Sequence, residues 1–151
     1  MARVFVAGHH GLVGSAILRL LLSLSFTGVV VRMHAELDLT SQAAVEAIFA
    51  VERPSYVVLA ASKVGGIDAN STFPADFIAA NLQMQTNVVD AALHCGSIRK
   101  LLFLSSSCIY PKFASQPIPE AKVVEKMGGK DHLLDDLHSS AGSSTASTVA
   151  R

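Results

Sequence analysis

The chain has 151 residues, half of them hydrophobic, and a formal net charge of zero at pH 7. This predicts one domain with a substantial core and excludes the positive field that nucleic-acid binding requires. No apolar run reaches the length of a membrane span, and the run before Gly8 is shorter than a signal-peptide core. Neither a membrane partner nor export is therefore expected, and the protein is expected to be cytoplasmic. Two cysteines are too few for a disulfide framework, so we expect Cys95 and Cys108 to be thiols.

Strands and helices are predicted to alternate through the first two thirds of the chain. Apolar, β-branched runs predict buried strands at residues 4–7, 29–33, 56–61 and 100–105. Helical spacing of apolar residues predicts a helix from Leu12 to Leu24, and Thr40 is a plausible N-cap for a second helix over residues 41–51, which Pro54 ends. Pro74 opens a long helix that ends near Gly96.

Such alternation is typical of βαβ units and predicts an α/β fold, a Rossmann-type parallel sheet with flanking helices. Residues 1–120 are assigned to this domain, which lacks the later strands of a complete one. After Glu120 the composition shifts to a Ser/Thr/Ala-rich tract that buries too little apolar surface to offset its ordering entropy. Residues 121–151 are therefore expected to be a disordered tail, with one marginal helix near residues 131–137.

The segment GHHGLVG follows the first predicted strand and opens the first predicted helix. In that context Gly8 permits a tight turn, Gly11 lets a pyrophosphate approach the backbone, and Gly14 lets the helix pack against the strand. The helix N-terminus supplies N–H donors to phosphate. The alternative is that these glycines merely permit the turn.

The end of the second strand distinguishes the two nicotinamide cofactors, because a carboxylate there binds the ribose of NAD and basic groups bind the 2′-phosphate of NADP. The sequence is VRMHAELDL, with Arg32 and His34 ahead of Glu36, which favours NADP. Asp38 either hydrogen-bonds the adenine amino group or is an ordinary surface carboxylate. His9 and His10, adjacent on a turn, are not expected to hold a metal without further ligands.

The segments GHHGLVGSA, HAELDLT, KVGGIDANSTFPADFIAANL and KLLFLSSSCIYPKFASQPIPE together resemble the GDP-L-fucose synthase family of extended short-chain dehydrogenases, over about residues 3–120. The resemblance implies NADPH-dependent epimerisation and reduction of GDP-4-keto-6-deoxy-D-mannose. It implies that Ser106 hydrogen-bonds the C4 carbonyl and that Cys108 is an acid/base in epimerisation; without it, Cys108 would be read as an inert thiol. The positions it assigns to the cofactor are Gly8, His10, Gly11, Leu12, Val13, Gly14, Arg32, His34, Asp38, Leu39, Ser105 and Ser106.

The chain departs from the family pattern at two of these positions. Where the family has GHRG, with an arginine expected on the 2′-phosphate, this chain has His10, which is mostly neutral at pH 7 and has no bidentate fork. Ser105 stands where the family usually has glycine, close to the cofactor.

Reduction in this superfamily requires a Tyr-x-x-x-Lys pair. The chain has two tyrosines, Tyr56 and Tyr110, and four residues beyond them stand Ala60 and Ala114. The substrate domain is also missing. We therefore expect a chain that keeps the cofactor half of the enzyme and is inactive alone. The alternatives are a regulatory fragment that pairs with an intact subunit through the helix near residues 74–95, and a fragment without function.

Overall fold

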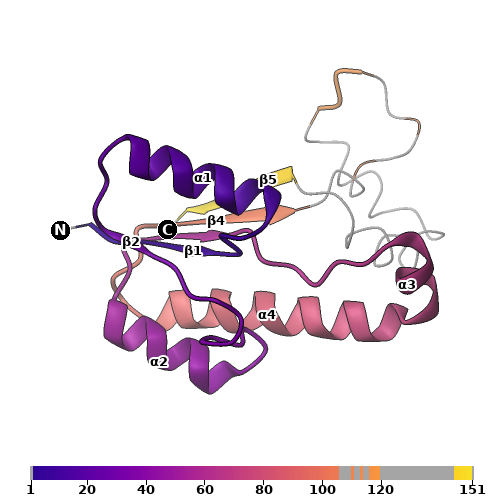
Figure 1. Cartoon of the computed structure of the whole chain (residues 1–151), viewed down its shortest axis with the longest axis horizontal. Helices are drawn as coiled ribbons and strands as arrows, with labels where there is room; N and C mark the ends of the chain where they lie inside the picture. The colour runs from indigo at the N-terminus through magenta and orange to yellow at the C-terminus, as the bar shows by residue number, and fades with distance from the viewer. Residues whose placement is uncertain (1, 106–109, 111–112, 114–115, 120–144, 151) are drawn as a thin grey trace.

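The computed structural model describes residues 2–105, 110, 113, 116–119 and 145–150 (Figure 1). Its centre is a parallel sheet of four strands, β2-β1-β3-β4 in spatial order, with a fifth strand on the β4 edge. The parallel strands are β1 (Val4–Ala7), β2 (Val29–Val30), β3 (Tyr56–Leu59) and β4 (Lys100–Ser105). The four predicted strands and the α/β class are confirmed, although β2 and β3 end earlier than predicted.

Helices cover both faces of the sheet. Helix α1 (Leu12–Ser23) lies on one face, and α2 (Gln42–Glu52) and α4 (Pro74–His94) lie on the other (Figure 1). The chain moves outward from β1 to β2 and then back across β1 to β3. Since crossovers between parallel strands are right-handed, this reversal places the later helices on the opposite face. The reversal also creates a switch point at the carboxyl end of β1, where open α/β sheets bind ligands.

Each face of the sheet has its own apolar core. Between the sheet and α2 and α4, the rings of Phe5 and Phe49 pack edge to face with centroids 5.6 Å apart, next to the fully buried Val45. Between the sheet and α1, Val6 and Val58 pack against Ile17 and other residues of that helix. Val45 and Phe49 are thus the buried residues of α2 that face the sheet.

The helix boundaries differ from the prediction in two places. Ser41, not Thr40, caps α2, because its hydroxyl accepts the Ala44 N–H while Thr40 donates to Asp38. A short helix, α3 (Ile67–Thr72), which the sequence pattern does not predict, forms between β3 and α4.

On α1, only part of the predicted apolar stripe is buried. Ile17 and Leu21 pack on the sheet, whereas Leu12, Leu20 and Leu24 are exposed. The periodicity correctly predicts the helix but overestimates the width of its buried face. None of the described helices combines the length and apolar character that a membrane crossing needs.

The fifth strand, β5 (Thr145–Ala150), pairs antiparallel with β4, with Lys100 opposite Ala150 and Ser105 opposite Thr145. This strand corrects the expectation of a disordered tail at these residues. The Thr and Val residues within it favour extended backbone, and the edge of β4 offers unpaired backbone groups to any such segment. The proposed helix near residues 131–137 and the rest of the 120–144 segment lie outside the described residues.

Candidate dinucleotide site

The glycine turn after β1 is held by close backbone packing. Gly8 has a φ of +84°, and a Cβ there would lie 2.6 Å from the backbone of Ala60 and Ala61. The Gly11 N–H donates to the Gly8 carbonyl at 2.9 Å. A Cβ on Gly14 would lie 2.2 Å from that same carbonyl oxygen, so α1 can approach β1 only because this residue is glycine.

The N-terminus of α1 opens at the carboxyl edge of the sheet. Gly11 is its N-cap and offers no side-chain cap, and the first turn carries no acidic residue. Leu12, the first helical residue, is 89% exposed. The first-turn N–H groups and the positive end of the helix dipole are therefore not neutralised by a local carboxylate, which suits an anion such as a pyrophosphate.

Two histidine side chains lie on this turn. His9 is buried and His10 is exposed, and their ring centroids are 4.2 Å apart. Burial lowers the pKa of His9, the neighbouring His10 lowers it further, and Glu36 acts in the opposite direction. The lowered pKa favours the neutral form of His9. The effect of Glu36 on this ring shows that the glycine turn and the loop after β2 lie close together.

The lowered pKa of His9 predicts that the fold loses stability in mild acid. Because the unfolded chain protonates this ring at a higher pH than the folded chain does, the free energy of unfolding falls as the pH drops through about 6.5 toward the lower folded value. We expect thermal unfolding measured between about pH 7.5 and 5.5 to show this loss, and His9→Gln to reduce it. His94→Gln, a change at an exposed ring on α4, is the control; equal pH slopes in wild type and His9→Gln would contradict the assignment.

The loop between β2 and α2 holds the predicted adenine-side residues. The Asp38 carboxylate accepts hydrogen bonds from the Thr40 N–H at 2.9 Å and its hydroxyl at 2.8 Å, and these bonds lower the pKa of Asp38. Asp38 is exposed, so one face of the carboxylate stays open to solvent. The Leu39 side chain lies in the core, which leaves only its backbone to meet a cofactor.

Of the two basic residues that follow β2, Arg32 is held in an ion pair and His34 is exposed. The Arg32 guanidinium pairs with the Glu52 carboxylate at 2.5 Å and also donates to the Val31 carbonyl, while Arg3 binds the other Glu52 oxygen. His34 is exposed and close enough to Asp38 to contribute to its lowered pKa. A 2′-phosphate would therefore meet His34 directly but would have to draw Arg32 away from Glu52.

The loop after β3 reaches the same edge of the sheet. Asn81 of α4 accepts the Lys63 N–H at 2.7 Å and donates to the Lys63 carbonyl at 2.9 Å, and the Lys63 ammonium lies 5.4 Å from the Phe77 ring centroid. Sequence reasoning missed this anchor. Asn81 is one of several polar residues of α4, so the sequence alone does not single it out.

The structure brings together the predicted residues of the glycine turn and of the loop after β2, and it places Ser105 at the end of β4 on the same edge. Ser106 and Cys108, the predicted catalytic pair, lie outside the described residues. Within the described part of the chain, no group of three or more His, Cys, Asp or Glu side chains is arranged to hold a metal ion. The glycine turn, the N-terminus of α1 and the loop after β2 together form the candidate dinucleotide site, called the cradle below.

Known proteins are similar to this chain in sequence and in fold. The chain is 82% identical over 118 residues to a probable GDP-L-fucose synthase 1 of Oryza sativa subsp. japonica, covering 78% of this chain and 36% of that protein. A GDP-mannoheptose C4 reductase from Campylobacter jejuni with NADP bound matches with a TM-score of 0.76 and 34% identity, over 82% of this chain and 39% of that one. A GDP-L-fucose synthetase from Naegleria fowleri bound to NADP matches with a TM-score of 0.75 and 26% identity, over 93% and 40%.

The chain thus spans little more than a third of the length of the curated relative. A family model described as NAD dependent epimerase/dehydratase matches residues 4–128, most of the chain and all of the cradle. The chain belongs to the NAD dependent epimerase/dehydratase family.

Proposed function

We propose that this chain binds NADPH as the cofactor half of a GDP-L-fucose synthase. The observation that carries the proposal is the N-terminus of α1, whose first turn has no acidic residue and which lies at the switch point of the sheet. The close contact between Gly8 and Gly14 holds it there. The choice of NADPH is supported by similar solved structures that have NADP bound. When bound, the nicotinamide supplies the hydride for carbonyl reduction.

Each part of the cradle has a proposed partner on the cofactor. The N–H groups around Gly11 and the first turn of α1 bind the pyrophosphate, with Leu12 and Val13 flanking it and Gly14 keeping the helix close. Asp38 accepts from the adenine amino group, and the Leu39 backbone lies beside the ring. His10, His34 and Arg32 surround the 2′-phosphate. The resemblance to the family assigns Ser105 and Ser106 to the nicotinamide side of the site.

The substrate side of the proposal rests on the relatives alone. A GDP-linked keto sugar would meet Ser106, which stabilises the developing charge on the C4 oxygen, and Cys108, which moves protons at the neighbouring carbons. An epimerase and a reductase in one intact polypeptide make the whole protein multifunctional. A cytoplasmic location belongs to the same proposal and is supported by the free thiol of Cys95.

The exposed His10 provides a direct test of NADPH binding. His10→Arg restores a charged, forked donor beside the 2′-phosphate, and one charge-assisted hydrogen bond contributes about 1.5–3 kcal/mol. We expect calorimetry to show NADPH binding about ten- to a hundredfold tighter in this variant, with NADH binding unchanged.

The matched control is His94→Arg, which adds the same charge at the far end of α4, where the ring is 77% exposed. It should leave the affinities for both nucleotides unchanged. An NADPH-to-NADH affinity ratio that is the same in His10→Arg and wild type would place His10 away from the 2′-phosphate.

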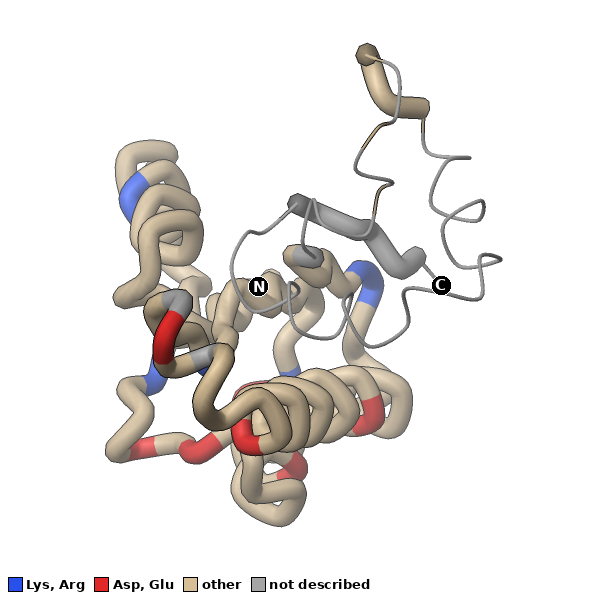
Figure 2. Tube along the Cα trace, turned by 90° about the vertical axis from the view of Figure 1, so that its right-hand side faces the viewer, with Lys and Arg blue, Asp and Glu red and all other residues tan. Residues whose placement is uncertain are grey.

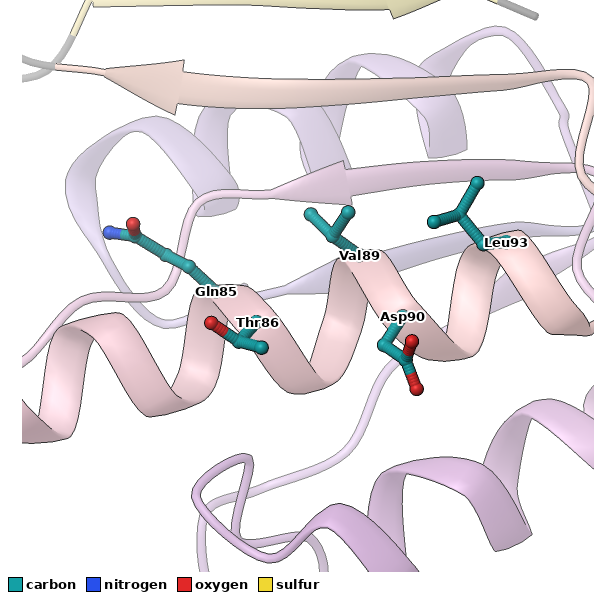
Figure 3. Close-up of a pocket in the computed structure, with 5 residues that line it drawn as sticks. All are labelled: Gln85, Thr86, Val89, Asp90 and Leu93. Carbon is teal, nitrogen blue, oxygen red and sulfur yellow. The ribbon is translucent and has the colours of Figure 1, made fainter.

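A second candidate function is association with an intact subunit through α4. Val89 and Leu93 project from this helix beside Gln85, Thr86 and Asp90, around an open depression of about 320 Å³ (Figure 3). Leu82 and Leu93 are each about half exposed, so an apolar stripe runs along the helix. Light scattering of the chain alone and mixed with an intact relative separates the two functions, because cofactor binding alone predicts no new complex.

A further inference from the structure

The loop of residues 37–41 has little support from its own backbone. Leu37 and Leu39 point into the core, and the Ser41 N–H donates to the Asp38 carbonyl at 3.0 Å. The Thr40 N–H is taken by the Asp38 carboxylate. The two leucine side chains pack the loop against the core, whereas both of these hydrogen bonds are local. A hydrogen-bonded tie to an element distant in the sequence comes from another side chain.

Asn87 provides that tie. It lies on α4 and is 7% exposed, with the neighbouring Val88 and Ala91 in the apolar core. Its Nδ2 donates to the Leu39 carbonyl at 2.9 Å, across 48 positions of sequence. Without this donor the Leu39 carbonyl would lose its described partner in an apolar setting, where an unsatisfied polar group is costly.

The bond acts next to the group that the proposed function assigns to adenine. The Leu39 carbonyl shares its peptide plane with the Thr40 N–H, and that N–H donates to the Asp38 carboxylate at 2.9 Å. Fixing the Leu39 carbonyl therefore fixes the donor that orients the Asp38 carboxylate. The carboxylate itself is exposed, and within the described part of the chain it accepts its hydrogen bonds from Thr40. A side chain buried in α4 thereby sets the position of an exposed group at the mouth of the cradle.

We propose that Asn87 is the positioning residue for the adenine side of the dinucleotide site, acting through the Leu39 carbonyl on Asp38. This inference rests on the proposed function. Asn81, six residues earlier on α4, holds the Lys63 loop after β3 in the same manner. The two asparagines thus anchor different loops on opposite sides of the glycine turn.

The test variant is Asn87→Leu, which keeps the branched shape of the side chain, with two methyl groups in place of the amide O and NH2, and removes the donor. The probe is 2′,5′-ADP, which carries the adenine, the 2′-phosphate and one 5′-phosphate but no nicotinamide. We expect its affinity, measured by calorimetry well below the melting temperature, to fall about tenfold. Hydrogen exchange at the Thr40 and Ser41 amides should accelerate, while amides of β1 and β3 keep their protection relative to global stability.

Two controls separate positioning from stability. Leu101→Val removes a buried methylene group from β4, away from the β2 loop, and should lower the melting temperature without changing 2′,5′-ADP affinity. Asn81→Leu should accelerate exchange near Lys63 while 2′,5′-ADP affinity stays as in wild type. Equal 2′,5′-ADP affinity and equal loop exchange in wild type and Asn87→Leu would overturn the inference alone. Folded wild-type protein that binds neither 2′,5′-ADP nor NADPH would overturn the proposed function and the inference with it.

Discussion

Replacing Gly14 with alanine is expected to abolish cofactor binding and to lower the melting temperature by roughly 6–12 °C. The new Cβ would lie 2.2 Å from the Gly8 carbonyl oxygen and 2.7 Å from its carbon, and both belong to backbone that the sheet holds in place. Helix α1 must therefore move away from β1, at a cost of about 3 kcal/mol, and its N-terminal N–H groups move with it. Thermal unfolding and NADPH calorimetry measure the two effects.

Gly66→Ala is the matched control for this substitution. Gly66 is the N-cap of α3, and its φ of −68° is one that any residue adopts. A Cβ added there would meet nothing within 4 Å. It should change the unfolding free energy by no more than about 0.5 kcal/mol. Unchanged stability and NADPH affinity in Gly14→Ala would show that α1 does not pack on β1 as described.

The second large effect is on turnover. We expect the 151-residue chain, supplied with GDP-4-keto-6-deoxy-D-mannose and NADPH, to oxidise the cofactor at least about 10⁵-fold more slowly than an intact family enzyme. The lost positioning of the sugar corresponds to about 7–11 kcal/mol of barrier, and the missing proton donor adds about 10²- to 10⁴-fold. Neither Tyr56 nor Tyr110 can replace the donor, because alanine stands four residues beyond each.

An intact GDP-L-fucose synthase assayed in the same buffer is the positive control for that measurement. Product detected by chromatography must accompany any loss of NADPH, since slow oxidation of the free cofactor would imitate activity. Fucose-nucleotide formation by the chain alone at the rate of the intact enzyme would contradict the division into cofactor and substrate halves.

The sequence predicts the scaffold well because the signals are local. The β-branched runs at the four strands, Pro74 at the start of α4 and the glycines of the turn each act through nearby backbone sterics, and each is where the sequence places it. The predicted N-cap fails by one residue because Asp38 captures the Thr40 hydroxyl and leaves the capping role to Ser41.

What the sequence does not predict depends on tertiary partners. The pairing of Arg32 with Glu52 joins residues 20 positions apart, and the bond from Asn87 to Leu39 joins residues 48 apart. Charge placement follows the same pattern: Figure 2 shows acidic residues on the α4 side of the molecule, which the overall neutral composition conceals. A buried asparagine on an apolar helix face was visible in the sequence, but its partner was not.

The most direct test of the central claim is a calorimetric titration of the purified wild-type chain with NADPH, with NADH titrated in parallel. If the glycine turn, the open end of α1 and the loop after β2 form a cofactor site, the chain binds one NADPH with saturation and binds it more tightly than NADH. Folded protein that shows no saturable heat with either nucleotide would contradict the claim, and association through α4 would then become the leading function.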